Sequence, residues 1–125
     1  MTEVSAAILE KGGKYLICRR GAGGSCAHMW EFPGGKREAG ESPQECLERE
    51  CREELGVELK IEGLFDSFCW QSGERVMRFY FFFATLVKGT LVPTFHEEIR
   101  WVTPQELGGI ALCEADEQVK AKLLR

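Results

Sequence analysis

The chain has 125 residues, of which 44% are hydrophobic and 29% are charged, and its formal net charge at pH 7 is −4. This length and composition predict one globular domain over residues 1–125. The negative charge disfavours long nucleic acid as a partner, no apolar run approaches the ~20 residues of a membrane span, and the N-terminus lacks a signal-peptide pattern. We therefore expect a cytoplasmic protein that acts neither on long nucleic acid nor in a membrane.

Two apolar runs near the N-terminus predict a β-hairpin. They are Val4–Leu9 and Tyr15–Cys18, and the segment Lys11–Lys14 between them contains two glycines that suit a turn. The second strand ends in two adjacent arginines, the second of which is Arg20. Such a pair is commonly a solvated strand end, although a guanidinium also suits phosphate oxygens. The glycine-rich Gly21–Met29 is expected to be a flexible loop that could move over a bound substrate.

A helix is predicted from Pro43 to the residue before Gly56. Ser42 can cap its start, Pro43 suits the first helical position, and Glu45 can complete a capping box. Gly56 supplies the stop. An apolar residue recurs every fourth position along the helix, so one stripe is expected to face a core. The members of this stripe are Leu47, Cys51 and Leu55.

The same helix carries three carboxylates on another face. Glu50, Glu53 and Glu54 stand at i, i+3 and i+4, which places them close together, and Arg49 could orient one of them. The alternative is a solvated acidic face with i,i+4 ion pairs from Glu45 to Arg49 and from Glu48 to Arg52. A further carboxylate, Glu41, precedes the helix on a glycine-flanked loop. Clustered carboxylates are ligands that Mg²⁺ takes together with waters and phosphates.

The second half of the chain is richest in strand patterns. Leu59–Trp70 and Arg75–Lys88 are predicted to pair antiparallel across a turn at Gln71–Glu74. Alternating aromatics of the second run are expected to be mostly core, with Phe79, Phe81 and Phe83 on one face and Tyr80, Phe82 and Ala84 on the other. A capped helical turn is predicted at Thr103–Leu107, and a short amphipathic helix at Cys113–Leu124.

The six cysteines are at positions 18, 26, 46, 51, 69 and 113 and show no C-x-x-C metal spacing. The even count permits disulfides, but the apolar neighbours of several cysteines favour reduced, buried thiols in a cytosol.

Residues 35–57 match the pattern G-x5-E-x7-R-E-U-x-E-E-x-G-U, in which U is bulky and apolar. The matching residues are Gly35, Glu41, Arg49, Glu50, Glu53, Glu54, Gly56 and Val57. Cys51 stands at the first U, where an aliphatic residue is more usual; a buried cysteine is a small hydrophobe, so the departure is mild. The chain thus resembles the Nudix family, and the W-E-F-P-G-G-K run at residues 30–36 resembles its MutT-like subgroup of 8-oxo-dGTP diphosphatases and CTP pyrophosphohydrolases.

The resemblance implies a fold and a reaction. It implies an α/β/α sandwich with a mixed β-sheet between the helix of residues 43–55 and the C-terminal helix, as a monomer or homodimer. The implied reaction converts a (d)NTP and water to a (d)NMP and pyrophosphate with Mg²⁺, or with Mn²⁺ as a substitute. By resemblance, the metal ligands are Gly35, Glu50, Glu53 and Glu54. Glu50 or Glu53 is the candidate base, and Arg49 holds a glutamate in place.

Four residues outside the motif are implied to bind the substrate. They are Arg20 and Arg75, Phe32 through its backbone, and Asp116, which stands where the subgroup has a base-recognising Asn or Asp. Arg75 could equally be a strand-end charge, and Asp116 a first-turn helix charge. An ionised Asp116 would only accept hydrogen bonds, which favours bases that present N–H groups.

One position departs from the subgroup. Phe95 stands where a glutamate often serves as a further metal ligand or base, so Glu97 or Glu98 is the candidate replacement. Oxidised nucleotides of the 8-oxo-dGTP type, or CTP and dCTP, are the expected substrates. ADP-ribose hydrolases typically have a proline, and dinucleoside polyphosphate hydrolases a tyrosine, soon after the motif; this chain has neither there. Those substrates stay open as alternatives, together with a non-catalytic nucleotide-binding domain and an interaction protein with an acidic helix.

Overall fold

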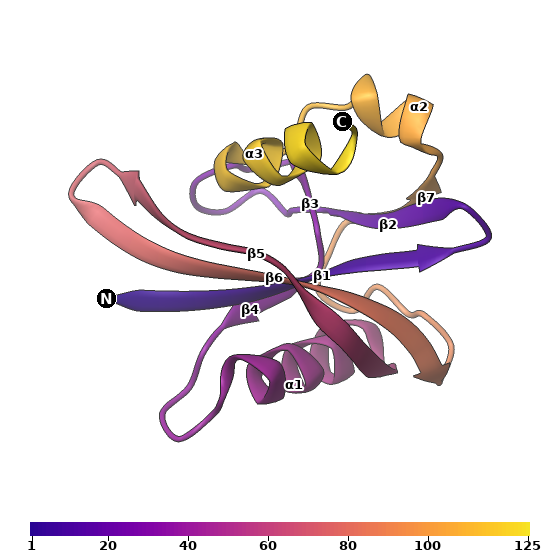
Figure 1. Cartoon of the computed structure of the whole chain (residues 1–125), viewed down its shortest axis with the longest axis horizontal. Coiled ribbons are helices and arrows are strands. Elements are labelled where there is room, and N and C mark those ends of the chain that lie inside the picture. Colours follow the sequence, from indigo (N-terminus) through magenta and orange to yellow (C-terminus); the bar gives the residue numbers. More distant parts are fainter.

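A twisted sheet with helices on both faces forms the computed structural model, which describes residues 1–125 (Figure 1). The strands are β1 (Thr2–Lys11), β2 (Lys14–Arg19), β3 (Trp30–Glu31), β4 (Gly34–Lys36), β5 (Glu58–Ser72), β6 (Arg75–Lys88) and β7 (Glu98–Val102). The helices are α1 (Pro43–Leu55), α2 (Pro104–Gly108) and α3 (Glu114–Leu123). Helix α1 lies on one side of the sheet, and α2 and α3 lie on the other (Figure 1). This arrangement confirms the predicted sandwich.

Strand β1 is the centre of the sheet. The strand order is β3-β2-β1-β6-β5, with β4 paired to β1 and β7 paired to β2. The β1–β6 pair is parallel and the other pairs are antiparallel, so the sheet is mixed as expected. Pairing of Ala6 with Gly34 and of Ser5 with Gly35 brings β4 against β1, directly before the chain enters the loop to α1.

Helix α1 has the predicted limits. Ser42 Oγ accepts from the backbone N–H of Glu45, the Glu45 side chain accepts from the backbone N–H of Ser42, and Gly56 is left-handed with φ 71°. Leu47, Cys51 and Leu55 are buried against Phe82 and other core residues. Because Glu45 serves the cap, the alternative ion pair from Glu45 to Arg49 does not form.

The long β5–β6 hairpin divides its aromatic residues between the two faces. Phe81 is buried in the core under α3, and Phe82 is buried in the core over α1. Phe79 stacks on Phe81, and Tyr80 stacks on Phe82, as the alternation predicts. Strand β6 therefore contributes an aromatic side chain to the core on each face of the sheet.

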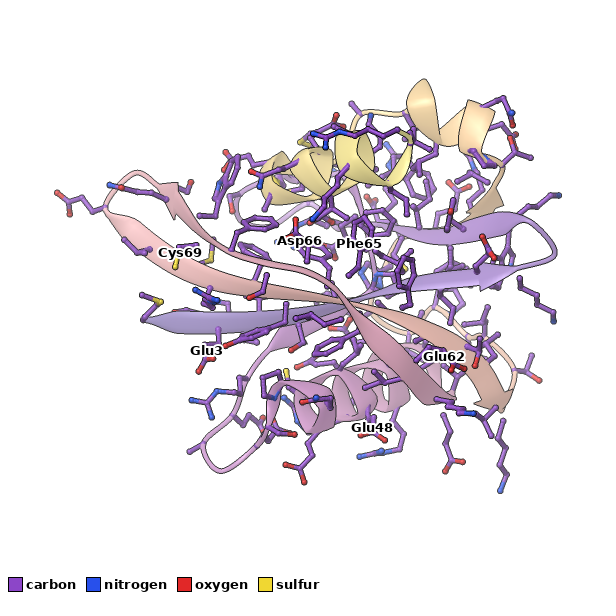
Figure 2. The ribbon with its side chains drawn as sticks, in the orientation of Figure 1. Glu3, Glu48, Glu62, Phe65, Asp66 and Cys69 are labelled. Atoms are coloured by element: carbon purple, nitrogen blue, oxygen red, sulfur yellow. A yellow bond between two sulfur atoms is a disulfide. The ribbon has the colours of Figure 1, made fainter.

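Helix α3 packs on the opposite side of the sheet from α1. Val119 is fully buried in that core. Lys122 Nζ lies 3.4 Å from Asp66 Oδ1 and 5.2 Å from the ring centroid of Phe65, two β5 residues that Figure 2 shows beneath α3. No helix of the protein is long and apolar enough to cross a membrane.

The expectation of reduced cysteines is wrong for one pair. Cys26 and Cys113 form a disulfide, with their Cα atoms 5.6 Å apart and 87 residues between them in sequence. The two residues meet because Trp30 bridges to Leu112, which brings the Gly21–Met29 loop beside the start of α3. The remaining cysteines are free, three of them buried and one exposed: Cys18, Cys46, Cys51 and the exposed Cys69.

Candidate active site

A cavity of about 430 Å³ extends from α1 on one face of the sheet to the start of α3 on the other. It has the size of a small-molecule site. Its walls come from α1, the Glu31–Lys36 segment, the tip of the β5–β6 hairpin, the Gly21–Met29 loop and the first turn of α3. Seven sequence-predicted residues line it: Arg20, Phe32, Gly35, Glu50, Glu54, Arg75 and Asp116. Five other motif residues lie outside its lining: Glu41, Arg49, Glu53, Gly56 and Val57.

Arg49 binds three carboxylates, of which Glu50 lines the cavity and Glu41 and Glu53 lie outside it. Its Nε and Nη2 donate to Glu41 at 2.6 and 3.0 Å, and its Nη1 donates to Glu50 at 2.9 Å and to Glu53 at 3.1 Å. The Arg49 guanidinium, with the backbone N–H of Glu38, lowers the pKa of Glu41 to about 2. Arg49 therefore orients several glutamates, which exceeds the single partner expected from the sequence.

Glu50 and Glu54 form a carboxylate pair in the cavity wall. Burial, followed by the charge and hydrogen bond of Glu50, raises the pKa of Glu54 to about 8. Gly35 leaves room for the Glu50 carboxylate, since a Cβ at that position would overlap it. With this raised pKa, Glu54 is mainly protonated at neutral pH when no cation is bound, which relieves its repulsion with Glu50.

This donor set fits a divalent metal. Carboxylate and carbonyl oxygens are the ligands of hard cations, and a cation would stabilise the buried charge of Glu50 and Glu54. The side chain of Glu53 is 54% exposed and bonded to Arg49. No three histidine, cysteine or acidic side chains form a ready metal cluster. A bound ion would accordingly draw on the Glu50–Glu54 pair, with waters and substrate oxygens completing its ligands.

Asp116 is placed to contact a ligand. Its Oδ2 accepts a hydrogen bond of 2.8 Å from the backbone N–H of Phe32, and its Oδ1 has no hydrogen bond within the protein. Burial, and next the charge of Glu31, raises the pKa of Asp116 to about 8. At neutral pH the carboxyl is mainly protonated, so it can donate as well as accept. The acceptor-only behaviour expected of an ionised Asp116 thus applies at higher pH, because the sequence did not reveal how deeply the side chain is buried.

Glu31 is a site residue that sequence reasoning missed. Arg20 Nη1 donates to its Oε1 at 2.9 Å, and His96 Nε2 lies 2.9 Å from its Oε2. The His96 side chain has no exposure, and its Nδ1 has no partner. Arg20 Nε is also buried without a partner. The W-E-F run contained Glu31, but only the fold joins it to Arg20 and to His96, 65 residues away.

The Phe95 segment provides no replacement glutamate in the cavity. Phe95 lines the cavity and is 64% exposed. Glu97 pairs with His28, Glu98 pairs with Arg100, and neither glutamate is part of the lining. Acidic groups of the cavity therefore come from α1, Glu31 and the start of α3.

Comparison with known proteins gives a consistent result. Residues 1–125 match the NUDIX domain model. The CTP pyrophosphohydrolase of Escherichia coli (strain K12) is 37% identical over 116 residues, covering 93% of this chain and 86% of that protein. The 8-oxo-dGTP diphosphatase of the same strain is 30% identical over 118 residues, covering 94% and 92%. The solution structure of the E. coli ORF135 protein superimposes with a TM-score of 0.84 at 35% identity, covering 97% of this chain and 86% of that one.

Proposed function

The chain belongs to the Nudix hydrolase family, and on this basis we propose that it converts a nucleoside triphosphate and water to a nucleoside monophosphate and pyrophosphate. The names of its relatives, a CTP pyrophosphohydrolase and an 8-oxo-dGTP diphosphatase, support this reaction. We propose that the protein acts in the cytoplasm, where nucleoside triphosphates are available as substrates. We also propose that it is a monomer or a homodimer.

One observation carries the proposal. A single cavity joins the Glu50–Glu54 carboxylate pair to the uncommitted Oδ1 of Asp116, with Arg20 and Arg75 also in its walls. A nucleoside triphosphate needs cationic and metal partners at its phosphates and a hydrogen-bonding partner at its base. The cavity offers both kinds of partner in one space.

Nudix hydrolases generally use divalent metal ions, and we propose Mg²⁺ here, with Mn²⁺ as a substitute. The proposed ligands are Glu50, Glu53, Glu54 and the carbonyl of Gly35. When bound, the ion supplies charge that neutralises phosphate oxygens and polarises phosphorus. Glu53 would have to exchange its contact with Arg49 for this role.

The protein groups have separate proposed tasks. Glu50 or Glu53 takes the proton of the attacking water, and Arg49 fixes the orientation of both through its Nη1. Arg20 and Arg75 bind phosphate oxygens. Asp116 bonds to the base beside the Phe32 backbone, which its Oδ2 already engages.

The base is the finer part of the proposal. A largely protonated Asp116 can donate one hydrogen bond and accept another, so it can match a base edge that presents both kinds of group. Cytosine and oxidised guanine both present such edges. We propose CTP, dCTP or an oxidised nucleotide of the 8-oxo-dGTP type as the substrate.

Two measurements test this function. A panel of CTP, dCTP, 8-oxo-dGTP, 5-methyl-dCTP, the common triphosphates, ADP-ribose and a dinucleoside polyphosphate should give its highest kcat/KM on a cytosine or oxidised-guanine triphosphate. Electron paramagnetic resonance of Mn²⁺ should show binding to the wild type and weaker binding to Glu54→Gln. Turnover of ADP-ribose alone would contradict the substrate class, and equal Mn²⁺ binding would contradict the metal site.

A further inference from the structure

The Gly21–Met29 loop is held to the protein at its ends. The Arg20 N–H donates to the Met29 carbonyl at 2.8 Å, and Arg19 Nε donates to the His28 carbonyl at 3.1 Å. Residues 22–25 are exposed and make no hydrogen bond. The side chain of His28, near the second end, also pairs with Glu97. The disulfide from Cys26 to Cys113 is therefore the one bond that joins the tip of this loop, residues 22–26, to the body of the protein.

This disulfide is part of the cavity wall. Cys26 and Cys113 line the cavity together with Ser25 and Asp116. Cys113 immediately precedes α3, and its carbonyl accepts from the Asp116 N–H at 2.8 Å. One helical turn thus separates the disulfide from the carboxyl that we propose contacts the base.

The start of α3 does not depend on the disulfide for its position. The Cys113 N–H donates to the Trp30 carbonyl at 2.9 Å, and Asp116 accepts from Phe32. Trp70 Nε1 also donates to Glu114 Oε2 at 3.1 Å. Breaking the disulfide would release the tip of the loop and leave α3 anchored by these bonds.

Other cysteines are poor sites for thiol exchange. Burial raises the pKa of the Cys18 and Cys46 thiols and raises that of Cys51 to about 12. A buried thiol with a raised pKa is rarely a thiolate, which is the reactive form. Cys69 is exposed but has no cysteine partner in the structure. Cys26 and Cys113, which are half-buried at the cavity, are therefore the cysteines whose oxidation or reduction makes or breaks a covalent bond between the loop and the body of the protein.

We propose that the Cys26–Cys113 disulfide is a redox-controlled latch on the substrate cavity, an inference that rests on the proposed function. With the bond formed, the Gly21–Met29 loop completes the cavity wall and the nucleotide binds tightly. With the bond reduced, the loop leaves the wall and the nucleotide binds more weakly. The carboxylates of α1 are unaffected, so the change appears in KM and leaves kcat nearly constant.

The redox step is a thiol–disulfide exchange with a dithiol. One thiolate of the dithiol attacks a sulfur of the pair and forms a mixed disulfide, and its second thiol then displaces the remaining cysteine. Two electrons and two protons pass to the protein, which gains two Cys thiols while the dithiol becomes a disulfide. A small-molecule disulfide such as oxidised glutathione reverses the exchange.

The test compares KM and kcat of the full chain after treatment with oxidised glutathione and after treatment with dithiothreitol. Reduction should raise KM for the preferred triphosphate roughly three- to tenfold, the cost of ordering a loop on binding. Cys26→Ser and Cys113→Ser should each have the KM of the reduced protein in both treatments. Cys69→Ser is the control, because it removes an exposed thiol outside the cavity lining and should keep the full response.

Two further readouts do not depend on turnover. Alkylation followed by mass measurement should count four free thiols after oxidation and six after reduction. Limited proteolysis should cut the Gly21–Met29 loop faster in the reduced protein. Six thiols after oxidation, or equal KM and equal cleavage in both states, would overturn the latch while leaving the proposed function standing. Absence of turnover in both states would instead overturn the proposed function and the latch that rests on it.

Discussion

Glu54 is the side chain whose environment departs most from that of an ordinary surface glutamate on α1, since burial and Glu50 raise its pKa to about 8. In Glu54→Gln the metal would lose an anionic ligand while the side chain keeps its shape. We expect kcat to fall by about 10²-fold or more. Because glutamine cannot ionise in this buried position, the metal-free protein should be at least as stable as the wild type.

Glu48→Gln is the matched control for this change. Glu48 is on the same helix but projects from the side away from the sheet (Figure 2), outside the cavity lining. Its kcat should stay within a factor of about two of the wild type. Steady-state kinetics and urea unfolding of both variants measure the difference, and a Glu54→Gln enzyme of near wild-type activity would remove Glu54 from the metal site.

The raised pKa of Asp116 should make the free energy of unfolding depend on pH. Its pKa is about 8 in the fold, against an ordinary value of 3.8, so the native state holds one more proton between these pH values. The free energy of unfolding contributed by this group is therefore undiminished below about pH 4, falls as the pH rises from about 4 to about 8, and stays low above that. Asp116→Asn keeps an acceptor for the Phe32 N–H and removes the titration.

Urea unfolding at several pH values measures this effect. The advantage of Asp116→Asn over the wild type should grow by roughly 1–3 kcal/mol between pH 4 and pH 8. A difference between the two proteins that is constant over this range would show that Asp116 titrates normally and is ionised at neutral pH.

Two kinds of cavity residue could be predicted from the sequence. Some belong to the local helical pattern, and others were implied by the family resemblance, namely Arg20, Phe32, Arg75 and Asp116. Glu50 and Glu54 followed from helical spacing, and the fold brings both to the cavity. Glu31 and His96 could not be found in this way, because the two residues are 65 positions apart in sequence and only the fold brings them into contact. Sequence spacing also placed Glu53 with the other carboxylates, but it could not show that Arg49 donates a hydrogen bond to the Glu53 carboxylate.

The two glycines of strand β4 have different neighbours, so substituting each one should affect the protein in a different way. A Cβ on Gly35 would overlap the carboxylate of Glu50, a flexible side chain. A Cβ on Gly34 would overlap the backbone carbonyl of Ser5 on β1, which cannot move without breaking the pairing of the two strands.

Gly35→Ala should accordingly fold and lose activity, whereas Gly34→Ala should lose stability. We expect a fall in kcat of about tenfold or more for Gly35→Ala with little change in the unfolding midpoint. Gly34→Ala should lower the free energy of unfolding by about 2 kcal/mol or more. Thermal unfolding and kinetics of the two variants distinguish these outcomes, and two variants with the same profile would contradict the assigned contacts.

An element could be predicted from the sequence where the residues that specify it lie within it or next to it. Helix α1 is specified by Ser42, Glu45 and Gly56, all within or next to it, and its limits were predicted closely. The short strands β3 and β4 have no such local determinants, because pairing with β2 and β1 defines them. The Cys26–Cys113 bond joins residues that no local pattern connects, and it was not predicted.

The disulfide also has a consequence for the whole molecule. It joins residues 87 apart and so restricts the unfolded chain. Reduction should lower the free energy of unfolding by about 2–4 kcal/mol. Urea titrations of the oxidised and reduced forms measure this, with Cys69→Ser as a control that should show the same difference between forms. Equal unfolding midpoints for the two forms would mean that the bond does not persist in the native state.

The measurement that tests the central claim most directly is phosphorus NMR of the reaction products. CTP and 8-oxo-dGTP would each be incubated with the protein in Mg²⁺ and, separately, in EDTA. We predict that at least one yields the nucleoside monophosphate and pyrophosphate in Mg²⁺ and stays intact in EDTA. Release of a nucleoside diphosphate and orthophosphate, or equal hydrolysis in EDTA, would contradict a metal-dependent pyrophosphohydrolase built on Glu50 and Glu54.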